Sequence, residues 1–449
     1  MERLVVIGGD AAGMAAASNA RRRRPAADLE IVALEKGRWT SYSACGIPYV
    51  LGGDVDGMET LVVRSPQEFR DRYDIDARTQ SEVTAIDLEA GVVEVRDDAA
   101  GRTYRLGFDH LMVATGAVPR RPALPGIDST GVHGVQTLED GYALLQRADA
   151  GDVRNVVVVG GGYIGLEVAE AFLKRGCHTT VVEQAPEVMR SLDPDMGARV
   201  SAAMRAAGIT VRCGEAVTGF EPGRVITSAG PIAGDVVVLG LGVVPNSGLA
   251  AHAGIGLGAA GAVAVDDHQR TDRPGVWAAG DCCESLHLVS GRRTHVALGT
   301  VANKQGRVAG INLGGGDAAF PGVLGTAVTR LCRAEIARTG LNSRQAADAG
   351  FTAETATVES TTRAGYFPGA EPLTVKVVVE RGTARLLGAQ IVGGDGAAGR
   401  IDVFAAALAA ETTVDELLNL DLSYAPPFGP VWDPVLIAAR QAWAEVERV

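Results

Sequence analysis

One cysteine, Cys45, stands in a short segment rich in glycine and proline, residues 41–53 (SYSACGIPYVLGG). Taken alone, such a cysteine is often a small buried hydrophobic residue. The next cysteine along the chain is Cys177 and none precedes Cys45, so we do not expect an internal dithiol at this segment. If Cys45 is a redox centre, it must pair with an exogenous thiol, carry a persulfide, or cycle through sulfenic acid.

The chain before Cys45 has the pattern of a dinucleotide-binding turn. An apolar strand, residues 3–8, leads into a Gly-rich turn, residues 8–13 (GGDAAG), and then into a helix of small residues. In such a turn the glycines let a phosphate approach the N–H groups at the helix N-terminus. Asp10 replaces the middle glycine of the GxGxxG pattern. A second strand, residues 29–34, ends at Glu35, where a carboxylate can accept hydrogen bonds from ribose hydroxyls.

A second copy of this pattern fits GxGxxG completely. An apolar strand, residues 156–159, precedes Gly160, Gly162 and Gly165, a helix follows, and the next strand ends at Glu183. A carboxylate at this position can accept a hydrogen bond from a ribose 2′-hydroxyl and would repel a 2′-phosphate, so we expect NADH rather than NADPH. Two dinucleotide folds in one chain favour hydride transfer between two dinucleotides.

The composition favours an α/β protein of several domains. The chain has 449 residues, 58 of them glycine, and is 47% hydrophobic but only 5% aromatic. Its formal net charge of −12 argues against a nucleic-acid partner. No apolar run approaches the about 18 residues of a membrane span and no leader pattern precedes the first strand, so we expect no membrane association and a cytoplasmic location. The seven histidines show no spacing typical of metal ligands, so no metal site is expected.

Two further strand ends carry the motifs Ala114-Thr115-Gly116 and Gly280-Asp281. Together with the two Gly-rich turns, and in this order, they resemble the pyridine nucleotide-disulfide oxidoreductases, a family of FAD enzymes. The resemblance extends over nearly the whole chain. It implies an α/β fold with two Rossmann-like dinucleotide-binding domains and a C-terminal α+β dimerisation domain.

The same resemblance implies a domain order. The FAD-binding domain would consist of residues 1–118 and 247–322, with an NAD(P)H-binding domain, residues 119–246, inserted between them. Residues 323–449 would form the dimerisation domain of a homodimer.

Cofactor contacts are also implied by the resemblance. Asp281 would contact the ribityl chain of FAD, and Tyr163, within the stretch Gly-Gly-Tyr-Ile-Gly-Leu-Glu, would gate the nicotinamide pocket. The full set implied for FAD and NADH is Gly8, Ala12, Gly13, Glu35, Lys36, Val83, Thr115, Gly116, Gly160, Gly162, Tyr163, Ile164, Gly165, Glu183, Gly242, Gly280 and Asp281.

Within the family, the lone Cys45 resembles the branch with a single redox cysteine. That branch contains CoA-disulfide reductases, sulfur or persulfide reductases, and NADH oxidases and peroxidases. The oxidases and peroxidases typically carry a histidine in the first Gly-rich turn, where this chain has Ala11, and this difference counts against them. Ala44 stands where many CoA-disulfide reductases have asparagine, which leaves a sulfur reductase open.

Two groups of residues favour CoA as part of the substrate. Asn19 and Arg22 share one face of the first helix. In CoA-disulfide reductases this face and the segment before the cysteine contact CoA, which implies substrate contacts from Asn19, Arg22, Ser41 and Ser43. The basic run Arg21 to Arg24 could add charge for the phosphates of CoA, or it could only complement the C-terminal dipole of the helix.

The C-terminal part of the chain contains residues 365–370 (GYFPGA) and 421–427 (DLSYAPP). These stretches are similar to two motifs of CoA-disulfide reductases, whose tyrosines reach towards the other subunit's cysteine. The similarity implies that Tyr366 and Tyr424 act with Cys45 as catalytic residues, because a phenol can protonate a leaving thiolate.

We therefore expect a homodimeric FAD enzyme that reduces CoA disulfide, or a mixed disulfide containing CoA, with NADH. CoA bound covalently to Cys45 is an expected state of such an enzyme. The first alternative is reduction of persulfide, polysulfide or sulfur on the same cysteine, and an NADH oxidase comes third. A flavoprotein that only carries electrons or senses redox state is an alternative of a different class, and it would not need Cys45.

Overall fold

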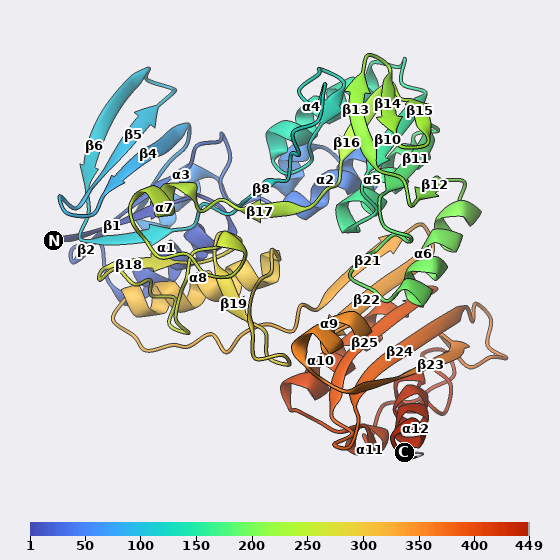
Figure 1. The fold of residues 1–449 in the computed structure, drawn as a ribbon. Coiled ribbons are helices and arrows are strands. Elements are labelled where there is room, and N and C mark those ends of the chain that lie inside the picture. The colour runs from blue at the N-terminus through green and yellow to red at the C-terminus, as the bar shows by residue number, and fades with distance from the viewer. Residues whose placement is uncertain (448–449) are drawn as a thin grey trace.

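The computed structural model describes residues 1–447, and the chain folds into three bodies (Figure 1). The first body is built on a parallel sheet with the strand order β18-β7-β1-β2-β3. Its strands are β1 (Glu2–Ile7), β2 (Leu29–Leu34), β3 (Ile75–Arg78), β7 (His110–Val113) and β18 (Val276–Ala278). Because β18 comes from much later in the chain, two separate stretches of sequence build this body.

Two parallel helices cover one face of this sheet. Helix α1 (Ala11–Arg23) follows β1, and α8 (Gly299–Leu313) lies alongside it (Figure 1). Their contact depends on small residues. A Cβ added to Gly306 would lie 2.3 Å from the carbonyl oxygen of Ala12, and one added to Gly310 would lie 2.3 Å from that of Ala16. The two helices therefore run closer together than larger side chains would allow.

The rest of the first body surrounds this sheet. An antiparallel sheet contains β4 (Ser81–Asp87), β5 (Val92–Asp97) and β6 (Arg102–Gly107). The smaller elements are α3 (Pro66–Tyr73), α7 (Gly248–His252), β19 (Glu284–Leu286) and β20 (Arg293–His295). Helix α2 (Ile47–Leu51), directly after Cys45, packs instead into the core of the second body (Figure 1).

The second body repeats the first in outline. Its parallel sheet has the order β12-β11-β10-β16-β9. The strands are β9 (Val132–His133), β10 (Asn155–Val159), β11 (His178–Glu183), β12 (Thr210–Cys213) and β16 (Val236–Leu239), and the helices are α4 (Leu138–Asp149), α5 (Tyr163–Lys174) and α6 (Pro194–Ala206). A small antiparallel sheet adds β13 (Val217–Glu221), β14 (Arg224–Thr227) and β15 (Gly230–Ala233). Strands β8 (Ala117–Pro119) and β17 (Val243–Pro245) pair where the chain crosses between the two bodies (Figure 1).

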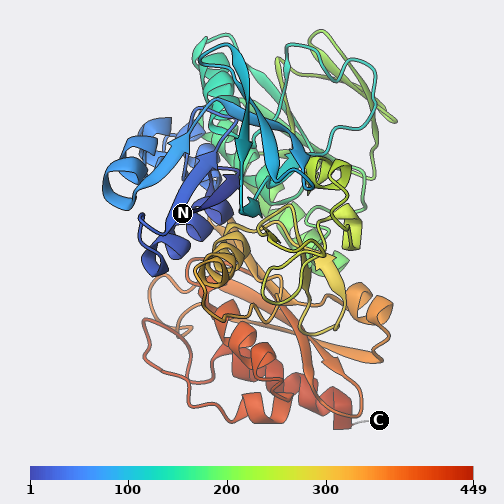
Figure 2. The same cartoon turned by 90° about the vertical axis from the view of Figure 1, so that its left-hand side faces the viewer.

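The third body is an antiparallel sheet covered by helices. The sheet has the order β21-β22-β25-β24-β23 and contains β21 (Ala327–Leu331), β22 (Ala334–Gly340), β23 (Ala353–Thr361), β24 (Pro372–Glu380) and β25 (Leu386–Gly393). Its helices are α9 (Ser343–Ala349), α10 (Ile401–Ala409), α11 (Val414–Leu418) and α12 (Pro434–Glu447). Figure 2 shows this body, coloured orange to red, at the bottom of the view, and helices α5 and α6 of the second body contact its sheet.

The predicted fold class is confirmed: two Rossmann-like parallel sheets are followed by an α+β body. The central strands β1 and β10 are apolar and buried on both faces, as parallel strands between helix layers require. Over residues 1–447, no helix combines the length and the apolar character needed to cross a bilayer.

Candidate active site

The first Gly-rich turn brings backbone segments into direct contact. Gly8 has a φ of +107°, and a Cβ there would lie 2.1 Å from the carbonyl oxygen of Ala114. A Cβ on Gly13 would lie 1.9 Å from the carbonyl oxygen of Gly8, so neither position admits a side chain. The carboxylate of Glu35, just past β2, accepts a hydrogen bond of 2.8 Å from the N–H of Gly9.

The second Gly-rich turn repeats this geometry. Gly160 has a φ of +106°, and a Cβ there would lie 2.4 Å from the carbonyl oxygen of Gly240. A Cβ on Gly165 would lie 2.0 Å from the carbonyl oxygen of Gly160. Glu183 accepts a hydrogen bond of 2.9 Å from the N–H of Gly161. Each turn opens at a helix N-terminus, whose partial positive charge favours a phosphate group.

The first turn and its surroundings fit FAD. Oδ1 of Asp281 is buried and has no hydrogen-bond partner in the described part of the chain. Burial raises the pKa of this carboxyl group, which is the expected effect on an acid that lacks compensating hydrogen bonds. His295 Nε2 lies 2.7 Å from the carbonyl oxygen of Asp281 and steadies the residue. The unpartnered oxygen suits a sugar-like hydroxyl, and the cradle of Gly8 and Gly13 suits a pyrophosphate.

The other predicted cofactor residues lie around the two turns. Thr115 Oγ1 donates a hydrogen bond of 2.6 Å to the carbonyl oxygen of Asn246, and the Asn246 amide donates one of 3.1 Å back to the carbonyl oxygen of Thr115. This pair joins the two crossover strands. A cavity of about 460 Å³ is lined by Glu35 and Lys36. Val83 is buried in β4, Gly116, Gly242 and Gly280 have positive φ values, and Ala12, Gly162 and Ile164 stand at the two helix N-termini.

Cys45 lies in a single turn of 3-10 helix, Ala44–Gly46, directly before α2. Its side chain is exposed, whereas the other five cysteines are buried or partly buried. A Cβ on Gly46 would lie 2.2 Å from a methyl group of Leu61, so the absence of a side chain lets this turn pack closely. Of the six thiols, Cys45 is therefore the most open to a substrate.

The charges around Cys45 are mainly negative. Partial desolvation and the carboxylates of Glu167, Asp281 and Asp10 raise the pKa of the Cys45 thiol. The surrounding protein thus favours the thiol over the thiolate. A positively charged or hydrogen-bonding group must offset this effect when Cys45 acts as a nucleophile.

The segment that carries Cys45 is anchored at its start by the first Gly-rich turn. Ser41 has a φ of +50°, in the left-handed region that non-glycine residues seldom adopt. Its N–H donates a hydrogen bond of 3.0 Å to the carbonyl oxygen of Gly9. The N–H of Tyr42 donates one of 3.1 Å to Oδ1 of Asp10.

The end of the same segment is anchored to the second body. Lys174 Nζ lies 2.6 Å from a carboxylate oxygen of Asp54, and the Arg175 guanidinium donates a hydrogen bond of 2.9 Å to the carbonyl oxygen of Leu51. The Cys45 segment therefore spans both dinucleotide-binding bodies.

Helix α5 carries two functional candidates on one face. Tyr163, its first residue, has its hydroxyl 3.5 Å from Ser191 Oγ, and burial raises its pKa. Glu167, one turn later, accepts a hydrogen bond of 2.8 Å from Thr329 Oγ1 on β21. Burial also raises the pKa of Glu167.

Glu167 was not among the residues predicted for the site. It is the last residue of the matched stretch Gly-Gly-Tyr-Ile-Gly-Leu-Glu, and its spacing of four residues from Tyr163 places both side chains on one face of the helix. That spacing was the available signal. Thr329 gave no signal, because it comes from the third body and reaches Glu167 only in the folded chain.

The predicted CoA face of α1 is exposed at Arg22. Arg22 donates a hydrogen bond of 3.4 Å to Asn19 Oδ1 and has no carboxylate partner within the described chain. Its basic neighbours are engaged elsewhere: Arg21 donates to the carbonyl oxygens of Tyr73 and Asp74, and Arg24 pairs with Glu2. The basic run therefore offers fewer free charges than its sequence indicates.

Ser41 and Ser43 belong to the Cys45 segment and not to this helix face. The N–H of Ser43 donates a hydrogen bond of 2.9 Å to the carbonyl oxygen of Leu61. In the described chain no hydrogen bond joins either serine to Asn19 or Arg22.

The structure brings Tyr366 and Tyr424 together in the third body. They are 77% and 46% exposed, and slight desolvation with contact between the two hydroxyls raises the pKa of Tyr424. Phe428, Val431 and Trp432 are also exposed nearby in sequence. Such a group of exposed large apolar side chains is typical of an interaction surface.

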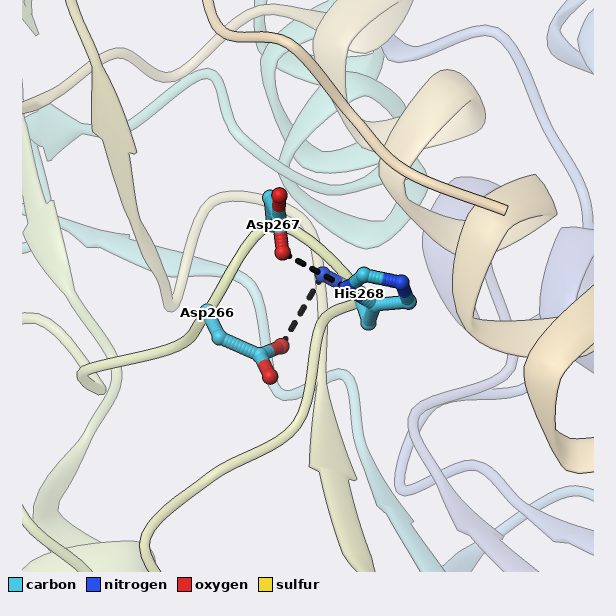
Figure 3. Close-up of side chains that lie close together, drawn as sticks. All are labelled: Asp266, Asp267 and His268. Carbon is cyan, nitrogen blue, oxygen red and sulfur yellow. Dashed lines mark hydrogen bonds and ion pairs between the residues drawn. The ribbon is translucent and has the colours of Figure 1, made fainter. Parts of the chain in front are cut away.

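One cluster resembles a metal site. Among residues 1–447, Asp266, Asp267 and His268 place ligand atoms within 4.8 Å of one another (Figure 3). Both imidazole nitrogens are already engaged, Nδ1 at 2.6 Å from Asp267 and Nε2 at 3.0 Å from Asp317. Hydrogen bonding to Asp267 is the main reason that the pKa of His268 is raised. These contacts account for the cluster as a feature of an exposed turn, and we assign it no metal.

Comparisons with known proteins agree with this geometry. Residues 2–306 match the pyridine nucleotide-disulphide oxidoreductase family, and residues 326–434 match the dimerisation domain of that family. The dimerisation domain supports a homodimer, and the family implies FAD and a nicotinamide dinucleotide as cofactors.

Individual relatives extend the similarity to both ends of the chain. The chain is 38% identical to the NAD(P)H coenzyme A polysulfide/persulfide reductase of Pyrococcus horikoshii over 444 residues, 98% of each chain. It is 30% identical to a coenzyme A disulfide reductase of Staphylococcus aureus over 430 residues, 95% of this chain and 97% of the relative. A solved NAD-dependent persulfide reductase from A. fulgidus superimposes with a TM-score of 0.96 at 37% identity, covering 99% of this chain and 84% of that one. This protein is therefore an oxidoreductase that belongs to the pyridine nucleotide-disulfide oxidoreductase family.

Proposed function

We propose that this protein uses NADH to reduce CoA disulfide, or a mixed disulfide that contains CoA, through Cys45. The proposal rests chiefly on the position of Cys45, an exposed thiol in a segment anchored to both dinucleotide-binding bodies. We assign FAD to residues 1–118 and 247–322, NADH to residues 119–246, and subunit contact to residues 323–449.

Glu183 supports NADH as the electron donor. Its two carboxylate oxygens accept hydrogen bonds from the N–H groups of Gly161 and Ala185, at 2.9 and 2.8 Å. These bonds fix a carboxylate at the end of β11, where the ribose of a bound dinucleotide would lie. A 2′-phosphate would meet this carboxylate, which disfavours NADPH.

Cys45 performs the sulfur chemistry. Its thiolate attacks one sulfur of CoA disulfide, the sulfur–sulfur bond breaks, a Cys45–CoA mixed disulfide forms, and one CoA thiolate leaves. FAD, when bound, supplies the electron pair that NADH delivers as hydride. Two electrons then break the mixed disulfide, which releases the second CoA and restores the Cys45 thiolate. The two CoA thiolates require two protons, one from NADH and one from solvent.

Tyr366 and Tyr424 supply the proton at the sulfur. The two phenols are in contact and exposed, on the body that the comparisons assign to dimerisation. In a homodimer they would reach the cysteine of the other subunit. A phenol there would protonate the leaving CoA thiolate and regain its proton from solvent.

The helix pair α1–α8 supplies the contact with the nucleotide end of CoA. Arg22 is exposed without a carboxylate partner, and Asn19 holds its guanidinium. A Cβ on Gly310 would lie 2.8 Å from Cβ of Asn19, so α8 borders the same face. Arg307, one turn earlier on α8, is exposed on that side. Two arginines on adjoining helices suit the phosphates of CoA.

Reduction of a persulfide or polysulfide is a second candidate. The relative with 38% identity bears the name of a coenzyme A polysulfide/persulfide reductase, whereas the named CoA disulfide reductase is 30% identical. Ala44 beside Cys45 also lacks the amide that many CoA-disulfide reductases place there. The two candidates share every step at Cys45 and differ in the leaving group.

Product analysis distinguishes the candidates. Purified enzyme is given NADH with either CoA disulfide or CoA persulfide, and the formation of CoA thiol and of hydrogen sulfide is followed over time. The values of kcat/KM for the two substrates are then compared. Faster CoA disulfide reduction supports the first proposal, and faster release of hydrogen sulfide supports the second. Cys45→Ser must abolish either turnover while leaving flavin reduction by NADH intact. Full turnover in this variant would exclude both candidates, and a preference for NADPH greater than tenfold would contradict the role of Glu183.

A further inference from the structure

Asp10 is the residue of the first Gly-rich turn that the proposed function does not use. It stands where a dinucleotide turn normally has its middle glycine, which lets the backbone approach the pyrophosphate. A carboxylate beside a phosphate site is unfavourable by charge alone. The side chain at this position therefore needs a separate explanation.

Two hydrogen bonds from adjacent residues of the Cys45 segment end on this turn. The N–H of Ser41 donates to the carbonyl oxygen of Gly9 at 3.0 Å, and the N–H of Tyr42 donates to Oδ1 of Asp10 at 3.1 Å. Ser41, with its φ of +50°, is in a conformation that persists only when its surroundings fix it. The N–H of Val63 also donates a hydrogen bond of 2.8 Å to the carbonyl oxygen of Ser41. Asp10 supplies the one side-chain contact among these bonds, and a glycine in its place would not.

The surroundings of Asp10 are unfavourable for its negative charge. Burial, together with the nearby carboxylates of Glu35 and Asp281, raises its pKa to about 6, although hydrogen bonds from the N–H groups of Tyr42 and Ala11 oppose the shift. Its negative charge is in turn one of the causes that raise the pKa of Cys45.

We propose that Asp10 is a positioning residue, which fixes the Ser41–Tyr42 turn against the first Gly-rich turn and thereby holds Cys45 in place for attack on the disulfide. The inference rests on the proposed function only in taking Cys45 as the reacting thiol. Asp10 itself touches neither the disulfide nor Cys45. The acceptor oxygen of Asp10 positions Cys45. The negative charge of Asp10 has a separate effect, which is to raise the pKa of Cys45.

Two substitutions separate the acceptor from the charge. Asp10→Asn keeps an oxygen that can accept from the N–H of Tyr42 and removes the charge, whereas Asp10→Ala removes both. Asp56→Ala is the matched control, because Asp56 is an exposed carboxylate that follows the same segment. For each holoenzyme we would measure flavin bleaching by NADH, reoxidation by CoA disulfide, and the pH dependence of Cys45 alkylation by iodoacetamide, followed by peptide mass spectrometry.

The proposal predicts different patterns for these measurements. Reoxidation by CoA disulfide slows about tenfold in Asp10→Ala, as expected for an unmet hydrogen bond, and stays within about twofold of the parent in Asp10→Asn. Bleaching by NADH changes little in any variant. The midpoint of Cys45 alkylation falls to lower pH in both Asp10 variants and not in Asp56→Ala. Equal slowing of reoxidation in Asp10→Asn and Asp10→Ala, or no slowing in Asp10→Ala, would overturn the proposal.

Two further outcomes remain interpretable. If Asp10→Ala fails to hold flavin, Asp10→Gly takes its place, because glycine also removes the acceptor oxygen and is the usual residue at this position of a dinucleotide turn. Slow reoxidation of Asp10→Gly supports the proposal, and reoxidation at the parental rate overturns it. A slow Asp10→Asn enzyme overturns the proposal. Failure of the proposed function shows differently, as turnover that survives Cys45→Ser.

Discussion

The Glu167 carboxylate in the second body accepts a hydrogen bond of 2.8 Å from the Thr329 hydroxyl in the third body. One turn along α5, Glu170 accepts a bond of the same length from the N–H of Cys332. Helix α5 is thus bonded twice to the β21–β22 hairpin. Because α5 begins at Tyr163, the third body helps to fix the helix that faces the proposed nicotinamide pocket.

Thr329→Val should weaken the productive binding of NADH. The substitution keeps the side-chain shape and removes the hydroxyl, so Glu167 loses its bond across the two bodies. We expect flavin reduction by NADH to slow about fivefold, measured by stopped flow. Thr329→Ser should restore the parental rate. Thr339→Val is the control, because Thr339 is a buried threonine of the same sheet whose hydroxyl pairs with Thr326 at 2.7 Å. Equal effects of the two valine variants would contradict this assignment.

Gly8→Ala and Gly160→Ala should separate the two dinucleotide sites. Either Cβ would clash with a backbone carbonyl at a positive φ, in the first or the second turn respectively. We expect Gly8→Ala to lose flavin absorbance and Gly160→Ala to retain it. The flavin bound to Gly160→Ala should then be reduced by dithionite but not by NADH at ordinary concentrations. Loss of flavin from Gly160→Ala and not from Gly8→Ala would reverse the assignment of the sites.

Arg22→Ala should raise KM for CoA disulfide about tenfold or more with little change in kcat, as expected for the loss of a charge-assisted contact to phosphate. Arg307→Ala should act in the same direction. The control is Arg24→Ala, since Arg24 pairs with Glu2 and has no proposed contact with substrate. A disulfide without phosphate groups, such as that of pantetheine, should show no effect of Arg22. Equal losses with both disulfides would place Arg22 outside the binding of the nucleotide end.

His287 should make the fold sensitive to acid. Burial and the nearby charge of Arg338 lower its pKa to about 4, from 6.5. Between these values the unfolded chain binds the proton and the folded chain does not, so stability falls as the pH drops from 6.5 towards 4. We expect the parent to lose about 2 kcal/mol more than His287→Gln between pH 7 and pH 5. Urea unfolding of both proteins at the two pH values measures this difference, and parallel losses would show that another group is responsible.

The local patterns of the sequence predicted the framework well. Strand β2 occupies residues 29–34 as expected, and the two Gly-rich turns have the same shape. These features depend on neighbouring residues, since a buried strand followed by a glycine turn and a helix is stabilised by contacts within one unit.

Contacts between distant residues could not be predicted in this way. The bond between Thr329 and Glu167 and the engagement of Arg21 and Arg24 depend on partners that only folding brings near. The raised pKa of Cys45 has the same origin, because its carboxylate neighbours come from separate parts of the chain. A sequence pattern identifies the residue type at such a site but not its electrostatic surroundings.

The anchoring of the Cys45 segment to Lys174 and Arg175 has a consequence for how the enzyme works. A strap that joins the two dinucleotide-binding bodies opposes hinged opening between them. Cys45 would then keep a nearly constant position relative to both dinucleotide sites throughout the catalytic cycle. Substrates would have to enter and leave without the two bodies moving apart. The motions needed for turnover would then be those of side chains and not of whole domains.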